Sequence, residues 1–255
     1  MKQPILKTIG LTCRFGGLVA VNDLTISIEA GQTVGLIGPN GAGKTTVFNL
    51  LSGFTRASSG EAWFRGQNII GMPPFDIARL GMARTFQVTS LLGMLSVGKN
   101  VQLAVQGTLQ KSSSPLGFIE NWDEVEARAD QALMATGLTS LADRLVRQLS
   151  HGDQRRVEIA MALAAQPHVI LLDEPTQGMS ATETWATVDL IKELCASSPD
   201  LTVIIVEHDI PVVLELAERI IVLHLGGLIA DGSPAQISEN EDVQEAYLGL
   251  AHVGD

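Results

Sequence analysis

A nine-residue stretch, GPNGAGKTT at residues 38–46, constrains the fold of this chain more than any other feature. It lies between two apolar runs, TVGLI and VFNLL, and it contains three glycines, a lysine and two threonines. Because glycines offer no side chains to a core, the exposed main chain must serve something outside the protein. We therefore predict a buried strand, a main-chain loop and a helix in succession, with a ligand at the loop.

The stretch matches the pattern G-x-x-x-x-G-K-[ST] in full, so the expected ligand is a nucleoside triphosphate. Main-chain N–H groups and the positive end of the following helix dipole suit phosphate oxygens. Lys44 is expected to reach the β- and γ-phosphates, and Thr45 to ligate Mg²⁺. The residues predicted to contact the nucleotide are Gly38, Pro39, Asn40, Gly41, Ala42, Gly43, Lys44, Thr45 and Thr46. A glycine-rich turn before an ordinary helix is the alternative, which the complete motif disfavours.

A pair of carboxylates in HVILLDEPT supplies the second part of the predicted site. Residues 169–172 predict a buried strand, and Asp173 and Glu174 follow at its carboxyl end, where open α/β sheets bind ligands. Asp173 is predicted to hold Mg²⁺, and Glu174 to polarise the attacking water as a general base. An acidic strand end facing solvent is the alternative interpretation, which the upstream motif weakens.

Composition limits the classes of protein that remain. Hydrophobic residues make up 45% of the 255 residues, which allows a sizeable core, and no apolar run is long enough to span a membrane. The N-terminus lacks the pattern of a signal peptide, and Cys13 and Cys195 have no metal-site spacing, which fits a reduced cytosol. A net charge of −11 argues against a nucleic-acid partner.

The order of predicted elements indicates an α/β fold with a mostly parallel sheet. Strands are expected in ILKTIGLT, LTISIEA, TVGLIG, EAWFRG, HVILLDE and LTVIIVEHD, and helices in KTTVFNLLSG and DQRRVEIAMALAAQ. From about residue 91 to residue 147 helical patterns replace strands. We expect a nucleotide-binding core at 1–87 and 151–255 and an inserted helical subdomain at 88–150. GTLQKSSSPLG predicts a loop, which leaves the conformation of 107–122 open.

Further motifs resemble those of the ATP-binding cassette (ABC) ATPases, and they occur in that family's order. LSHGDQRR at residues 149–156 resembles the signature LSGGQ, and it lies directly before a long helix. The remaining matches are Phe15 at the position of the adenine-stacking aromatic, Gln87 at the Q-loop, Gln177 to Ser180 at the D-loop, and His208 at the switch histidine. The resemblance implies a P-loop NTPase (RecA-like) core with an antiparallel β edge.

The resemblance also implies roles for these residues. Ser150 and Gly152 would meet the γ-phosphate bound by a second, identical or paralogous, subunit in a head-to-tail dimer. His208 would contact the γ-phosphate, and Gln87 would touch Mg²⁺ and the attacking water. The catalytic set is then Lys44, Gln87, Glu174 and His208, the metal set is Thr45, Gln87 and Asp173, and the cofactors are ATP and Mg²⁺.

Three positions depart from the family pattern. His151 replaces the first signature glycine, Asp153 replaces the usual glutamine, and Ser180 replaces an aspartate or asparagine. Ser150 with Asp153, and Ser180 with Glu183, both fit helix-capping patterns, so a structural role competes at each serine. A partner for the Asp153 carboxylate is expected in one of two residues, Arg155 or Arg156.

CRFGGLVAVNDL, ARTFQ and the terminal EAYLG are similar to segments of ATPase subunits of branched-chain amino acid importers. This implies transmembrane permease subunits, a substrate-binding protein and a peripheral location at the cytoplasmic face of the inner membrane. Relatives that serve urea or short amides, and ABC ATPases without a transport role, remain alternatives.

Overall fold

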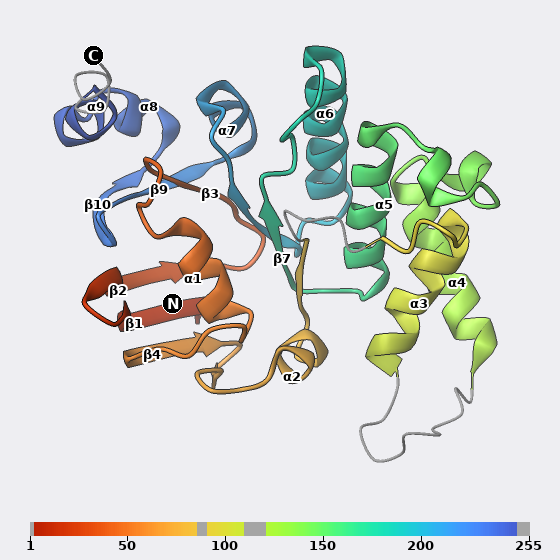
Figure 1. Cartoon of the computed structure of the whole chain (residues 1–255), viewed down its shortest axis with the longest axis horizontal. Helices are drawn as coiled ribbons and strands as arrows, with labels where there is room; N and C mark the ends of the chain where they lie inside the picture. Colours follow the sequence, from red (N-terminus) through yellow and green to blue (C-terminus); the bar gives the residue numbers. More distant parts are fainter. Residues whose placement is uncertain (1–2, 86–90, 110–120, 249–255) are drawn as a thin grey trace.

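The computed structural model of this chain describes residues 3–85, 91–109 and 121–248. Two sheets and a group of helices make up this part of the chain (Figure 1). The predicted site residue Gln87 and most of the segment 107–122 lie outside the described residues. No helix within the described ranges is both long enough and apolar enough to cross a membrane.

The central sheet has six strands in the order β10-β9-β3-β8-β7-β6. All neighbouring pairs are parallel except the antiparallel pair of β9 and β10. Every residue of β3, β7 and β8 is buried, as expected for strands covered on both faces. The strands span Thr33–Ile37 (β3), Met82–Arg84 (β6), Val169–Asp173 (β7), Thr202–Val206 (β8), Arg219–His224 (β9) and Gly227–Gly232 (β10).

A second, fully antiparallel sheet has the order β2-β1-β4-β5. Its strands span Leu6–Phe15 (β1), Leu18–Ile28 (β2), Ser59–Phe64 (β4) and Gln67–Asn68 (β5). The antiparallel strands that we expected at the edge of the core thus form a separate sheet. Strand β10 is an antiparallel edge strand of the six-stranded sheet. Helix α1, Lys44–Leu51, contributes Phe48 to the cluster of buried residues that joins both sheets.

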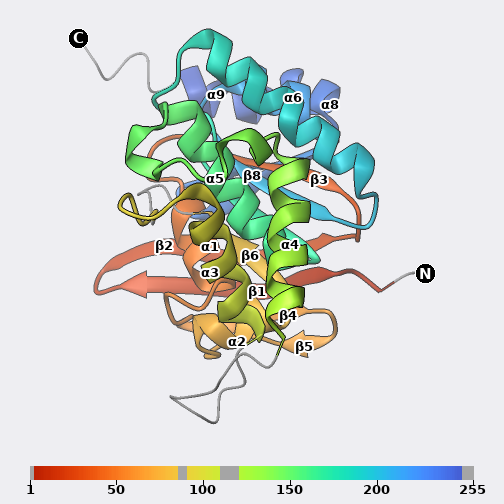
Figure 2. The same ribbon diagram turned by 90° about the vertical axis from the view of Figure 1, so that its right-hand side faces the viewer.

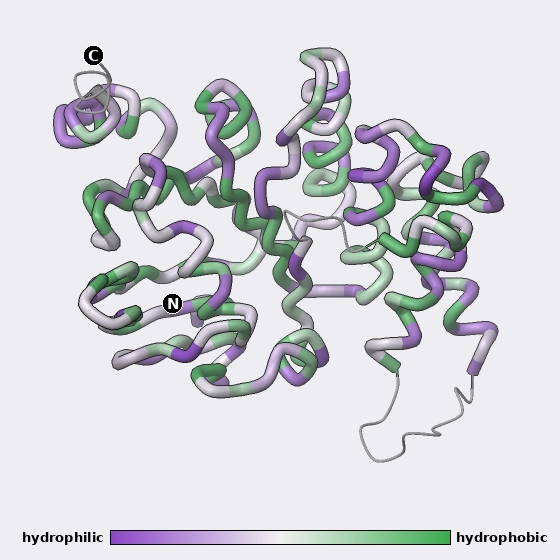
Figure 3. Tube along the Cα trace, in the orientation of Figure 1, coloured by the Kyte–Doolittle hydropathy of each residue, from purple (hydrophilic) through white to green (hydrophobic). Residues whose placement is uncertain are grey.

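Helices cover the other face of the parallel sheet. Strand β7 shows the alternation, because Leu171 packs in the cluster with α1, whereas Ile170 and Leu172 pack with α5 and α6. The hydropathy-coloured trace shows the apolar residues along these central strands (Figure 3). The helices span His151–Ala164 (α5), Ala181–Ser197 (α6), Ile210–Leu216 (α7), Pro234–Ser238 (α8) and Glu241–Leu248 (α9).

The predicted change to helices after residue 91 is confirmed by α3, Val97–Leu109, and α4, Trp122–Ala135. Two 3₁₀ turns, Thr139–Leu141 and Val146–Gln148, follow before α5. α3, α4 and α5 lie beside one another (Figure 2) and share a cluster of buried residues that includes Val101, Leu133 and Val157. A short helix, α2 (Pro74–Arg79), precedes β6 and was not expected from the sequence.

Candidate active site

The loop at residues 38–46 turns directly from β3 into α1, as predicted. Gly38, Gly41 and Gly43 all have positive φ angles, of 150°, 81° and 102°. A Cβ at Gly38 would lie 2.1 Å from the Leu223 carbonyl oxygen, and one at Gly43 would lie 2.3 Å from the Ala20 carbonyl oxygen. Glycine is therefore required at these two positions by both conformation and space.

At the start of α1, main-chain N–H groups without a side-chain cap lie beside the buried side chain of Lys44. Gly43 is the N-cap residue, so no side chain accepts from the first turn, and no acidic residue lies in that turn. Lys44 is 6% exposed, and its Nζ donates to the Gly38 oxygen at 2.6 Å and the Pro39 oxygen at 3.0 Å. Burial lowers the Lys44 pKa, while the charges of Glu174 and Asp173 oppose this shift. Such a helix start suits an anion.

Asp173, the last residue of β7, is almost fully buried at 1% exposure. Its Oδ2 accepts from Arg84 Nη2 at 2.8 Å, whereas Oδ1 is buried with no hydrogen-bond partner in the described chain. An orphaned carboxylate oxygen beside a phosphate loop fits a Mg²⁺ ligand. The described residues contain no group of three His, Cys, Asp or Glu side chains able to hold a metal.

The backbone at Glu174 is strained, and it lies beside the end of β8. Its φ of 48° is unusual for a residue with a side chain, and its main-chain N–H donates to the Val206 oxygen at 2.8 Å. The side chain is largely buried, and Oε1 lies 2.5 Å from Nε2 of His208. The structure thus brings together Lys44, Asp173, Glu174 and His208, which lie at or just beyond the carboxyl ends of β3, β7 and β8.

Two buried charged residues next to this group were missed by sequence reasoning. Arg84, in β6, donates from Nη1 to Asn49 and Ser52 of the α1 segment and from Nη2 to Asp173. Glu207 follows β8 and accepts from the Thr176 N–H at 2.8 Å and from the Thr176 hydroxyl at 2.6 Å. The acidic residue directly after a buried strand was a usable signal for Glu207, since Asp173 and Glu174 follow the same pattern.

Ser150 and Gly152 lie at the start of α5, where they contact nearby residues of the same chain. Ser150 is the N-cap, and its hydroxyl accepts from the Asp153 N–H at 3.1 Å, which confirms the capping prediction. Gly152 is buried, and its N–H lies close enough to the Glu183 carboxylate to help lower the pKa of that carboxyl. A Cβ at Gly152 would lie 3.3 Å from Oε1 of Glu183.

The partner expected for Asp153 among two candidate arginines is Arg156. Arg156 Nη1 lies 3.9 Å from Asp153 Oδ1. Arg155, the other candidate, is buried and donates to the Pro175 and Asp173 main-chain oxygens and to Glu158. Arg155 and Arg156 are neighbours on α5, so their side chains point in different directions. The side chain of Arg155 faces the core, whereas that of Arg156 is partly exposed.

The capping box predicted at Ser180 is confirmed. The Ser180 hydroxyl caps the Glu183 N–H, and the Glu183 carboxylate accepts from the Ser180 N–H and hydroxyl. These bonds from Ser180, aided by the Gly152 N–H and the charge of His151, lower the pKa of Glu183. The departure at Ser180 therefore has a local structural reason.

Phe15 is not a core residue, although an aromatic in a first strand usually is. It lies at the end of β1, opposite Leu18 in β2, and it is 52% exposed. Two residues beyond Leu18, the Ala20 carbonyl lies against Gly43. The exposed ring is thus carried on the hairpin that borders the loop.

Together the parallel sheet, the glycine loop between β3 and α1, and the carboxylates after β7 define the P-loop NTPase fold. The family model described as ABC transporter matches residues 21–177, and that of the branched-chain amino acid ATP-binding cassette transporter matches residues 228–253. The high-affinity branched-chain amino acid transport ATP-binding protein LivG of Escherichia coli K12 is 40% identical over 257 aligned positions, covering 98% of this chain and all of LivG.

Solved ABC cassettes share the fold. The ADP conformation of MJ1267 is 29% identical with a TM-score of 0.84, and the match covers 97% of this chain and 100% of that one. A dimeric post-hydrolysis state of MJ0796, bound to ADP and Pi, is 27% identical with a TM-score of 0.74, covering 90% and 98%. This chain belongs to the ABC transporter family, as an ATPase subunit of the branched-chain amino acid importer type.

Proposed function

We propose that this chain binds Mg-ATP at residues 38–46 and hydrolyses it in a head-to-tail dimer that drives amino acid uptake. The observation that carries the proposal is the convergence of Lys44, Asp173, Glu174 and His208 at one edge of the parallel sheet. These residues come from separate parts of the sequence, and a structural role alone gives no reason for a lysine and two carboxylates to be buried together.

The loop supplies main-chain N–H groups from Asn40, Gly41 and Gly43 for the phosphate oxygens, while the Ala42 N–H donates to the Pro39 oxygen and holds the turn. Lys44 and the uncapped start of α1, with Thr46 in its first turn, would hold the β- and γ-phosphates. Phe15 would stack on the adenine from the neighbouring hairpin, and its exposure supports this role.

Thr45, Gln87 and the orphaned oxygen of Asp173 are the residues that would hold Mg²⁺. When bound, Mg²⁺ neutralises charge on the β- and γ-phosphate oxygens. Arg84 fixes the other oxygen of Asp173, so the free oxygen has a defined direction.

Glu174 is the residue proposed to orient the attacking water and accept its proton. Its contact with His208 holds the carboxylate in place, and His208, with its side chain 46% exposed, remains able to donate to the γ-phosphate. Catalysis would then consist of positioning and charge stabilisation, with no covalent intermediate.

A second subunit, identical or paralogous, would complete each site with its Ser150 and Gly152. Both residues lie at the start of α5, and neither belongs to the group formed by Lys44, Asp173, Glu174 and His208 within the same chain. The dimeric state of the MJ0796 cassette with ADP and Pi supports this arrangement.

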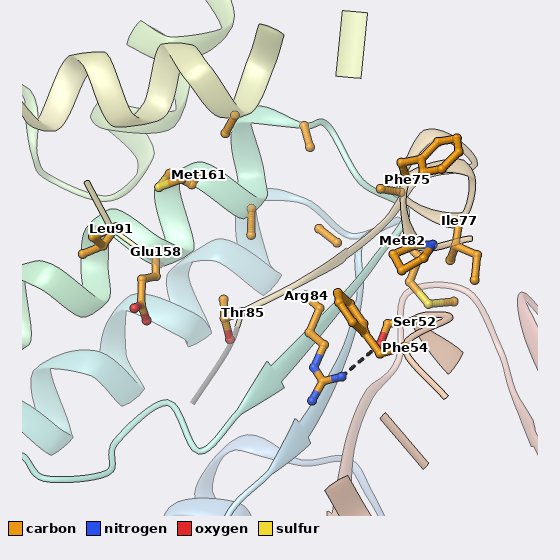
Figure 4. Close-up of a pocket in the computed structure, with 16 residues that line it drawn as sticks. Ser52, Phe54, Phe75, Ile77, Met82, Arg84, Thr85, Leu91, Glu158 and Met161 are labelled. Carbon is orange, nitrogen blue, oxygen red and sulfur yellow. Dashed lines mark hydrogen bonds between the residues drawn. The ribbon is translucent and has the colours of Figure 1, made fainter. Parts of the chain in front are cut away.

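The permease would dock in the groove shown in Figure 4, at the cytoplasmic face of the inner membrane. This groove has a volume of about 370 Å³ and lies between the α1–α2 segment, β6 and the helices α3 and α5. Phe54 and Phe75 on its wall are 55% and 56% exposed, which suits an apolar face of a cytoplasmic helix of the permease. Arg84 lines the same groove and bonds to Asp173, so the groove and the site share one side chain.

Branched-chain or other hydrophobic amino acids are the proposed cargo, selected by a substrate-binding protein and the permease. The match of residues 228–253 to the branched-chain amino acid model supports this cargo over urea or short amides, and over a role outside transport.

The decisive test compares Glu174→Gln with the wild type in Mg-ATP binding, ATP hydrolysis and sedimentation. The variant should bind Mg-ATP, hydrolyse it on the order of 10² to 10⁴ times more slowly, and form ATP-dependent dimers. Hydrolysis close to the wild-type rate would remove Glu174 as the base. Monomers at saturating ATP, with the permease present as well as absent, would refute the shared site. Leucine uptake by the reconstituted transporter tests the cargo.

A further inference from the structure

The buried side chain of Arg155, on α5, reaches the segment that carries Glu174. Its Nε donates to the Pro175 main-chain oxygen at 3.1 Å, and its Nη2 donates to the Asp173 main-chain oxygen. These residues lie directly after and directly before Glu174, so one guanidinium group holds the main chain on both sides of the proposed base. The Arg155 side chain is only 10% exposed, so water competes little for these carbonyl groups.

The main chain at Glu174 requires such support. Its φ of 48° is sparsely populated for a residue with a side chain, and a conformation of this kind persists only where the surroundings hold it. The Glu174 N–H donates to the Val206 oxygen at 2.8 Å, and the Glu174 oxygen accepts from the Gln177 N–H at 3.2 Å. Strand β8 and the following turn thus hold Glu174 itself, while Arg155 holds the carbonyl groups of its two neighbours.

Arg155 is held in turn by Glu158, which lies about one turn further along α5. Nη1 of Arg155 donates to Oε2 of Glu158, and the two side chains are only 10% and 7% exposed. The other oxygen of Glu158, Oε1, is buried and has no hydrogen-bond partner within the described ranges. Apolar residues of similar volume often stabilise a fold as well as a buried ion pair does, or better. Stability alone therefore does not explain this pair.

We propose that Arg155 is a positioning residue for Glu174. Its bonds to the carbonyl groups on both sides keep the strained main chain in place, so the Glu174 carboxylate keeps its direction toward the attacking water. Glu158 holds the planar guanidinium group in the orientation that these two bonds require. The inference rests on the proposed function, in which Glu174 is the base, and it gives a residue of α5 a role in hydrolysis rather than in nucleotide binding.

The variant Arg155→Met and the double variant Arg155→Met with Glu158→Met separate positioning from stability. The single variant leaves the Glu158 carboxylate buried without its partner, so its melting temperature should fall. The double variant removes that charge as well, so its melting temperature should recover toward the wild-type value. Both variants lack the bonds to the Asp173 and Pro175 oxygens, so kcat for ATP should fall on the order of 10- to 100-fold in each. Affinity for Mg-ADP should stay within about twofold of the wild type, because the phosphate loop is unchanged.

Amide hydrogen exchange over residues 170–178 of the full chain gives a readout that needs no ATP. Exchange should be faster in the double variant than in the wild type, because the main chain around Glu174 is held less firmly. Val157→Ala is the matched control, since Val157 lies on the same helix but is buried in the cluster shared by α3, α4 and α5. This control should lower the melting temperature and leave both kcat and the exchange over residues 170–178 unchanged.

The outcomes separate this inference from the proposed function. If kcat of the double variant recovers together with its melting temperature, Arg155 serves folding only and the inference is overturned. An equal fall of kcat in Val157→Ala would overturn it as well, because lost stability would then explain the effect. Unchanged hydrogen exchange in the double variant would show that Arg155 does not hold the main chain at Glu174. A wild type that hydrolyses no ATP would refute the proposed function, and the exchange measurement would still decide whether Arg155 holds this segment.

Discussion

The buried pair of Arg84 and Asp173 gives the sharpest stability prediction. Arg84→Met keeps the length of the side chain and an apolar contact with the Phe48 ring, over which the guanidinium now lies at 5.6 Å. It removes the bonds to Asn49 and Ser52 and leaves the Asp173 carboxylate without its partner. The two side chains are only 7% and 2% exposed, so water replaces little of the lost interaction.

Breaking a buried ion pair on one side costs about 3–5 kcal/mol. For a chain of this length about 2 °C is lost per kcal/mol, so the melting temperature should fall by roughly 6–10 °C. Lys44, whose charge couples to Asp173, favours the lower end of this range. In an Asp173→Asn background the same arginine substitution should cost much less, because no unpaired charge remains.

Thermal and urea unfolding of the single and double variants measure these costs. Arg79→Met is the matched control, since the pair of Arg79 and Asp76 is 28% and 40% exposed at 3.7 Å and should contribute under about 1 kcal/mol. Mg-ADP should stabilise Arg84→Met more than it stabilises the wild type, because Mg²⁺ gives Asp173 a new counter-charge. The reasoning is wrong if Arg84→Met costs under about 1 kcal/mol, or if Asp173→Asn does not reduce its cost.

Substitutions at three further positions test the site. Lys44→Ala should weaken Mg-ATP binding or stop turnover, because the loop loses its cation; a nucleotide titration matching wild type would contradict this. Phe15→Ala should weaken binding by roughly 5- to 150-fold, as expected for about 1–3 kcal/mol of stacking, while Phe15→Trp should retain affinity; equal binding by all three proteins would refute stacking. Glu207→Gln should reduce kcat more than nucleotide affinity, because Glu207 accepts from the Thr176 N–H and hydroxyl next to Glu174; unchanged kcat would contradict its role.

Features with a complete local signal were predictable from the sequence. The glycine loop requires positive φ angles at Gly38, Gly41 and Gly43, and only glycine adopts them freely. The caps at Ser150 and Ser180 need partners only three residues away, and both formed. Strands β3, β7 and β8 are apolar except for a threonine or aspartate at one end, so their burial followed from their composition.

Features whose partners lie far apart in the sequence were not predictable in this way. Strand β6 has three residues, which is too short for a periodic pattern, so the position of Arg84 beside Asp173 had no local signal. Arg155 and Arg156 look alike in the sequence, and only the direction of each side chain on α5 separated the buried one from the partner of Asp153. Tyr247 packs on a cluster of buried residues that contains Ile37, and these two residues lie far apart in the sequence.

The sequence by itself determined the family, the phosphate loop and the residue types available for chemistry, because each depends on short stretches of consecutive residues. Only the tertiary structure decided which of these residues meet. The strand order β3-β8-β7 places three carboxyl ends at one edge, and this sets Lys44, Glu174 and His208 around a single point. Strand order results from packing the whole apolar surface at once, so no single segment encodes it.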